Sequence, residues 1–99
     1  MTLIVKIKPR ARREINAAAA WWSENRLSAP GAVASDLKEA LEILVDFPGI
    51  GTKVENAKYP ETRRWLLERV GHHIYYRPRG KFLEIVAFWG AHREHAPSV

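Results

Sequence analysis

The sequence contains no cysteine, so it forms neither disulfide bonds nor thiolate metal sites. It also lacks any apolar run near the ~18 residues that a membrane-spanning helix needs. The opening stretch, Met1 to Lys8, has only a few consecutive apolar residues before lysines intervene, which is too little for a secretion signal. We therefore expect a cytoplasmic protein that makes no contact with a membrane.

The motifs of several common enzyme classes are missing as well. The chain has no glycine-rich phosphate loop, no Ser-His-Asp arrangement and no His-Glu-x-x-His motif. The turn Pro48-Gly49-Ile50-Gly51 follows an expected helix rather than a strand, so it does not fit a dinucleotide-binding fingerprint. His92 and His95 lie three residues apart, but no third ligand with suitable spacing stands nearby. We expect no metal and no cofactor.

The residues that are present indicate one folded domain over positions 1–99. The chain is 99 residues long, 46% of them hydrophobic, and it contains four tryptophans. Disordered chains are poor in aromatic residues, and this length supports one modest core.

Charge is distributed unevenly along the chain. The total is +5, made of +4 over residues 1–14, −3 over residues 15–50 and +4 over residues 51–99. This pattern predicts a basic sheet beside a more acidic helical layer, which would attract a polyanion or an acidic partner segment. Ordinary solvation is the alternative, since +5 is a usual charge for a small soluble domain.

Hydrophobic periodicity predicts one strand and two helices in the first half. Residues 2–8 alternate like a half-buried strand, and Pro9 suits the first turn of a helix that continues through Trp22. After a break at residues 28–31, apolar residues recur at helical spacing from Val33 to Val45. The short connection predicts an antiparallel helical hairpin that packs on a sheet.

The second half reads as three strands. Residues 64–70, 72–77 and 82–89 are rich in strand formers and are separated by turns at Gly71 and at residues 78–81, whereas residues 48–61 show no clear period. The last strand is apolar on both sides and should lie inside the sheet. The fold class is α+β with the order β-α-α-β-β-β, an N-terminal helical hairpin packed on a small antiparallel sheet.

Aromatic pairs suggest surface contacts. Trp21 and Trp22 point ~100° apart on their helix, so both cannot face one core, and an exposed tryptophan would suit a partner. Tyr75 and Tyr76 fall on opposite faces of a strand, which predicts one in the core and one exposed.

Basic residues of the sheet suggest a second kind of surface. Arg77 and Arg79 share one strand face if the strand continues that far, and paired guanidinium groups can bind phosphates. A solvated edge explains them equally well. His92 beside Arg93 has the chemistry of a general acid next to a cation.

Taken in order, these segments resemble the RelE/ParE superfamily of type II toxin-antitoxin toxins over nearly the whole chain. Four pieces carry the resemblance: the junction Val5-Lys6-Ile7-Lys8-Pro9-x-Ala11, the helix end Ala40-Leu41-Glu42-Ile43-Leu44-x-x-Phe47-Pro48-x-x-Gly51, the hairpin Ile74-Tyr75-Tyr76-Arg77-Pro78-Arg79-Gly80, and the ending Ile85-Val86-Ala87-Phe88-Trp89-Gly90-Ala91-His92-Arg93. The resemblance implies a small basic toxin neutralised by an antitoxin whose segment wraps the helical hairpin and sheet.

The superfamily has two branches with different targets. RelE-like members cut messenger RNA in the ribosome with basic sheet residues, and here Arg64, Arg77 and His92 or Arg93 occupy similar positions. ParE-like members inhibit DNA gyrase and lack that catalytic set. The long helical hairpin and the turn after Tyr76 look closer to ParE, although Trp89 stands where ParE-like endings usually have histidine.

The resemblance therefore implies a ParE-like toxin that binds DNA gyrase, with a ribosome-dependent mRNA interferase as the alternative. No catalytic residue is assigned under the first interpretation; under the second the set is Arg64, Arg77, His92 and Arg93. The expected antitoxin-binding residues are Trp21, Trp22, Leu37 and Leu41.

Overall fold

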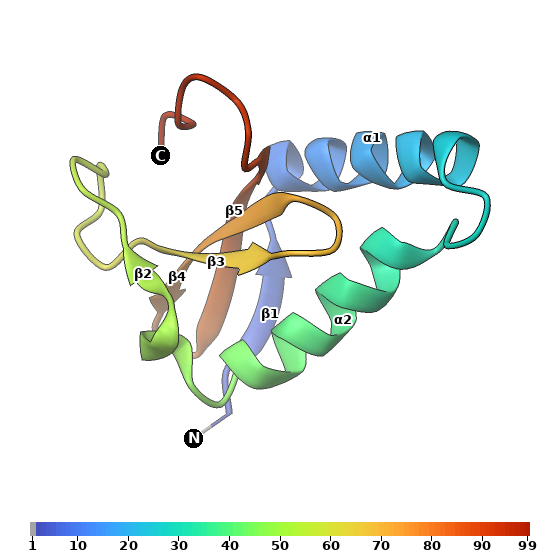
Figure 1. Ribbon diagram of the computed structural model, residues 1–99. Helices are drawn as coiled ribbons and strands as arrows, with labels where there is room; N and C mark the ends of the chain where they lie inside the picture. The colour runs from blue at the N-terminus through green and yellow to red at the C-terminus, as the bar shows by residue number, and fades with distance from the viewer. Residues whose placement is uncertain (1) are drawn as a thin grey trace.

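The computed structural model describes residues 2–99, and its elements follow the predicted order (Figure 1). They are β1 (Ile4–Ile7), α1 (Pro9–Asn25), α2 (Ala32–Leu44), the 3₁₀ turn η1 (Pro48–Ile50), β2 (Thr52–Lys53), β3 (Arg63–Leu67), β4 (His72–Arg79) and β5 (Phe82–Gly90). The α+β class and the order of helices and strands are confirmed. The short strand β2 lies in the stretch to which the sequence assigned no element.

The strands form one five-stranded sheet in the order β1-β5-β4-β3-β2. The pairs β2–β3, β3–β4 and β4–β5 are antiparallel, whereas β1 runs parallel to β5, so the complete sheet is mixed. β5 lies between β1 and β4, as its two apolar sides predict. β1 forms one edge of the sheet, and its outer side has no strand partner among the described residues.

The two helices cover one face of the sheet and spread apart like a V from the loop that joins them (Figure 1). α1 buries Ala11, Ile15 and Ala18. Their small or compact side chains let α1 approach β5 closely. α2 buries five positions at helical spacing, Ala32, Val33, Leu37, Ala40 and Leu44. On the sheet, this core includes Ile74, Tyr76, Leu83 and Ile85, all completely buried.

The opposite face of the sheet holds a second, smaller core. Tyr75 is 2% exposed and clusters with Val86 and Ala87, next to Trp89 and Val99. The expectation that one of the two neighbouring tyrosines is exposed is wrong, because both faces of the sheet are covered there. A β-bulge opposite Tyr75 places Val86 and Ala87 in the same cluster.

The C-terminal segment supplies much of this second cover. Trp89 Nε1 donates a hydrogen bond of 2.7 Å to the carbonyl of His95, and Arg10 donates one of 2.7 Å to the carbonyl of Ser98. Pro97 is buried. In Figure 1 this segment leaves the end of β5 and loops past the start of α1, away from α2.

Candidate functional site

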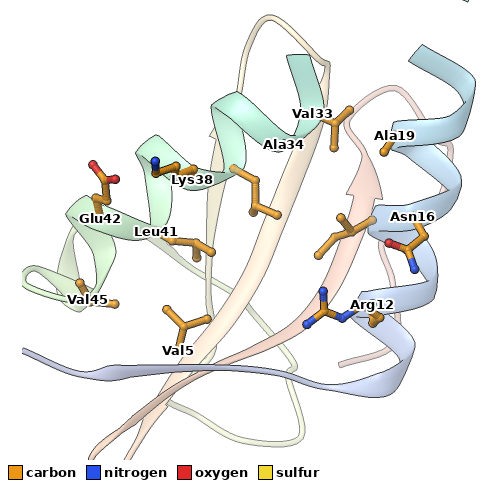
Figure 2. Close-up of a pocket in the computed structure, with 12 residues that line it drawn as sticks. Val5, Arg12, Asn16, Ala19, Val33, Ala34, Lys38, Leu41, Glu42 and Val45 are labelled. Atoms are coloured by element: carbon orange, nitrogen blue, oxygen red, sulfur yellow. The ribbon is translucent and has the colours of Figure 1, made fainter. Parts of the chain in front are cut away.

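A groove of about 540 Å³ runs between α1 and α2 (Figure 2). Its lining is mostly apolar: Val5, Arg12, Ile15, Asn16, Ala19, Val33, Ala34, Leu37, Lys38, Leu41, Glu42 and Val45. The groove exists because the helices diverge while Ala19 of α1 and Ala34 of α2 leave room between them. It is large enough to receive a row of apolar side chains from another chain.

Leu37 and Leu41, two of the residues predicted to bind an antitoxin, line this groove. Leu37 is nearly buried, and Leu41 is partly exposed on the same side of α2 one turn later. Arg12 and Lys38 lie at its borders with Glu42, so charged groups frame an apolar floor (Figure 2). An amphipathic segment matches that pattern.

Strand β1 contributes a residue that the sequence analysis missed. Val5 lines the groove and is 36% exposed, and its neighbour Ile4 is 53% exposed. Both belong to the edge strand, which the alternating pattern predicted only as a half-buried strand. Val5 could not be assigned to the groove because the sequence does not say which strand forms the sheet edge beside the helical hairpin.

Trp21 and Trp22 do not line this groove. Trp22 packs partly against the main core, and Trp21 is 48% exposed. Their rings meet edge to face at 6.2 Å between centroids. Both tryptophans line two hollows elsewhere, which they share with His72. The four predicted antitoxin-binding residues therefore belong to two separate surfaces.

Arg77, one of the predicted phosphate-binding residues, is engaged inside the protein. It is 9% exposed, and its Nε donates a hydrogen bond of 2.8 Å to Glu84. The ring of Tyr59 covers its guanidinium group at 4.0 Å. Burial works to raise the pKa of Glu84, but the hydrogen bond and charge of Arg77, with Lys8 and Arg79, hold that pKa below its ordinary value of 4.5.

Arg64 lies on β3 opposite Tyr75 and forms no ion pair among the described residues. The positive charge of Arg64 acts on His73, which lies on the neighbouring strand β4. Burial lowers the pKa of His73 first, and the charges of Arg64 and His72 lower it further. These effects favour the neutral form of His73.

His92 and Arg93 stand in the exposed turn after β5. The guanidinium group of Arg93 stacks on the ring of Trp89 at 4.0 Å. Trp89 pairs with His73, four residues along β4 from Arg77, a separation of about 13 Å. The structure therefore spreads the predicted nuclease residues along the sheet and does not bring them into one cluster.

A metal cluster and a membrane-spanning helix are both absent from the described residues. Between residues 2 and 99, no group of three histidine, aspartate or glutamate side chains is placed to hold a metal ion. No helix in that same range is long and apolar enough to cross a membrane.

Comparison with known proteins places the chain in a family. The family model described as the ParE toxin of the type II toxin-antitoxin system, parDE, matches residues 5–95. A solved structure described as the chromosomal ParDE TA system from P. aeruginosa has a similar fold, with a TM-score of 0.71 and 21% sequence identity, over 90% of this chain and 96% of that chain. No curated protein sequence matches. The chain belongs to the family of ParE toxins of type II toxin-antitoxin systems, as its resemblance predicted.

Proposed function

We propose that this toxin stops growth in the cytoplasm by binding DNA gyrase, and that its antitoxin neutralises it through the groove between α1 and α2. The gyrase part of the proposal rests on membership of the ParE family, and the antitoxin part rests on the groove, an apolar channel of about 540 Å³. An open apolar channel of this size on a small protein is the mark of a partner site.

The antitoxin segment that suits the groove is an amphipathic helix or strand. Leu37, Leu41 and Val5 would receive its apolar side chains, and Arg12 and Lys38 would meet acidic groups at its border. Trp21 and Trp22 are not part of this proposed contact, because they line other hollows.

Binding rather than catalysis suits the arrangement of the sheet. An RNA-cleaving site needs a phosphate-binding cation and an acid or base within reach of one another. Here Arg77 is held by Glu84 and covered by Tyr59, while His92 and Arg93 lie beyond the far end of β5. These contacts support a toxin that acts by occupying a surface of its target.

The second candidate function is ribosome-dependent cleavage of messenger RNA. One observation favours it: Arg64 forms no ion pair among residues 2–99, and it stands near His73 on the face of the sheet that the helices leave uncovered. Under this function, Arg64 would hold phosphate and His92 would act as the acid.

The decisive experiment measures plasmid supercoiling and transcript integrity in the same cells after the toxin is induced alone. We expect loss of negative supercoiling with intact transcripts, and recovery when the antitoxin is expressed with it. Purified toxin should likewise inhibit supercoiling by purified gyrase. Cleaved transcripts with normal supercoiling would contradict the gyrase proposal and assign the activity to RNA, with Arg64→Ala and His92→Ala as the first variants to test.

A further inference from the structure

Two hollows lie on the surface at the tryptophan end of α1. Their volumes are about 280 and 430 Å³, and both are lined by Trp21, Trp22 and His72. We call the surface formed by Trp21, Trp22, Arg26, His72 and Arg93 the tryptophan surface. It shares no lining residue with the groove between the helices.

Positions along α1 explain why the two sites are separate. The groove uses Arg12, Asn16 and Ala19, whereas the first hollow uses Glu14, Ala17 and Trp21. At about 100° per residue these two sets flank the buried stripe of the helix on opposite sides. A segment that fills the groove leaves the tryptophan surface exposed.

The fold does not require the exposed tryptophan. Trp22 packs partly against the main core, but Trp21 is 48% exposed and lies edge to face against Trp22. A large apolar ring beside a hollow offers contact area at low entropic cost, which is why tryptophan dominates many binding interfaces. The adjoining His72 and Phe88 rings stack at 4.8 Å and give the first hollow a second aromatic wall.

The charges around the tryptophan surface determine the chemistry of its occupant. Arg26 lies 4.9 Å from the centre of the Trp21 ring and forms no ion pair among the described residues. Arg93, which lines the first hollow, forms no ion pair among them either. The nearby acid Glu14 already accepts bonds from Arg10 and from the backbone N–H of Phe88.

The second hollow has one charge of each sign, Arg26 and Glu68, without an ion-pair partner among the described residues. Arg69 is bonded through two nitrogens to Asp36, which leaves Glu68 as its free acid. His72 Nδ1 donates to the carbonyl of Val70, since a carbonyl only accepts, so its Nε2 remains available. Over the two hollows together, the charges without an ion-pair partner among residues 2–99 are Arg26 and Arg93 against Glu68, and an acidic partner is complementary to that net positive charge.

We propose that the tryptophan surface binds an acidic peptide segment that carries one bulky apolar side chain, on a partner other than the antitoxin. The apolar side chain packs against Trp21 and Trp22, and acidic residues on either side of it pair with Arg26 and Arg93. The inference rests on the proposed function in one respect: the antitoxin occupies the groove, so this second partner binds the toxin while the antitoxin is in place.

Random peptides displayed on phage, panned on the purified toxin–antitoxin complex, test the proposal. We expect a consensus of one aromatic or large aliphatic residue flanked by acidic residues. A synthetic peptide of that consensus should bind the complex with an affinity that weakens as salt is raised. Trp21→Ala and the double variant Arg26→Glu/Arg93→Glu should each lower the affinity by about tenfold or more.

Matched variants separate this site from the groove and from folding defects. Arg13→Glu reverses an exposed charge on α1 outside every hollow named above, and Leu27→Ala truncates an exposed apolar residue just beyond α1. Both should bind the peptide like the wild type. Each variant must still bind the antitoxin and melt cooperatively. If Trp21→Ala does not, the peptide affinity of Arg26→Glu/Arg93→Glu tests the proposal.

Four outcomes would overturn the proposal. Recovered peptides that lack acidic residues would contradict the proposed charge complementarity. Peptides that bind both variants as tightly as the wild type would show that they do not bind at the tryptophan surface. Tighter binding of a single-stranded oligonucleotide at the same residues would assign the surface to nucleic acid. Peptide binding by the toxin alone but not by the complex would show that the antitoxin covers this surface. None of these results tests gyrase inhibition, which supercoiling measures separately.

Discussion

At the scale of single residues, the pair formed by Arg77 and Glu84 is the most consequential in this protein. Both side chains are about 10% exposed, and they meet across the hairpin of β4 and β5. The attraction between such charges roughly offsets the cost of removing them from water, but removing one partner leaves the other buried and uncompensated. The fold therefore keeps its stability only while both partners of the pair are present.

Glu84→Gln should lower the free energy of unfolding by about 2 to 3 kcal/mol at pH 7. Because the folded protein holds the pKa of Glu84 below 4.5, the ionised carboxylate stabilises the fold above that pH, and this stabilisation disappears as the pH falls through the lower folded value. Urea unfolding of both proteins across pH 7 to 3 should show the difference shrink on the acid side.

Glu94→Gln is the matched control, since Glu94 is exposed and forms no ion pair among residues 2–99. It should leave stability unchanged within about 0.5 kcal/mol. An equal cost for Glu84→Gln at pH 7 and pH 3 would contradict the role given to its ionised form.

Sequence could have indicated this pair more fully than it did. The turn at Gly80-Lys81 pairs Arg79 with Phe82, and that register places Arg77 opposite Glu84 two steps further along. Arg77 was predicted to be a free cation because composition and strand alternation contain no information on cross-strand register. Burial by Tyr59 was beyond any local pattern, since that residue comes from the loop before β3.

At the scale of elements, periodicity predicted the helices well because each buries one stripe against one sheet. It could not tell which side of α1 would face α2, since spacing fixes angles around one helix axis and not the position of a neighbour. Trp21 and Trp22 were therefore assigned to the same surface as Leu37 and Leu41, which they do not share. The C-terminal cover over Tyr75 was missed for a similar reason, because it has no regular period.

One hydroxyl group helps to hold the link between α2 and β3 on the sheet. Tyr76, completely buried on β4, accepts a hydrogen bond from the backbone N–H of Gly51 and donates one to the carbonyl of Pro48. A side chain at Gly51 would meet that hydroxyl oxygen and the carbonyl of Arg64, so only glycine fits here. The hydroxyl thereby fastens η1 to the sheet.

Tyr76→Phe should lower the free energy of unfolding by about 1 to 2 kcal/mol, because the N–H and carbonyl lose their partner without replacement. The backbone N–H of Gly51 should exchange with solvent faster, while amides in the middle of β5 keep their relative protection. Tyr59→Phe is the control, because the Tyr59 hydroxyl makes no hydrogen bond among the described residues, and it should cost under about 0.5 kcal/mol. Equal losses in the two variants would contradict the anchoring role.

At the scale of the whole molecule, the small fold presents three different surfaces. The groove is apolar, the tryptophan surface is aromatic and basic, and the face of the sheet opposite the helices is partly covered by the C-terminal segment. Family membership and fold were readable from the order of segments, because each segment is local. Division of the helical hairpin into separate binding surfaces was not, because it depends on how the two helices diverge.

The proposed antitoxin site implies a thermodynamic link between partner binding and stability of the whole toxin. A partner that binds only the folded chain adds about 2.7 kcal/mol at a free concentration of one hundred times Kd. For a domain of this size that corresponds to a rise in Tm of roughly 10 to 20 °C. Leu41→Glu should abolish most of this rise at the same antitoxin concentration, because a carboxylate would then face the apolar segment in the groove.

Ile43→Glu makes the same change on the same helix at a residue that is 46% exposed and lies outside the groove. It should keep the full rise in Tm, and both variants should melt cooperatively without antitoxin. Scanning calorimetry of each toxin with and without antitoxin measures the effect directly. If Leu41→Glu keeps the full rise, or if Ile43→Glu loses as much, the antitoxin does not bind along the groove and its site must be sought on another face.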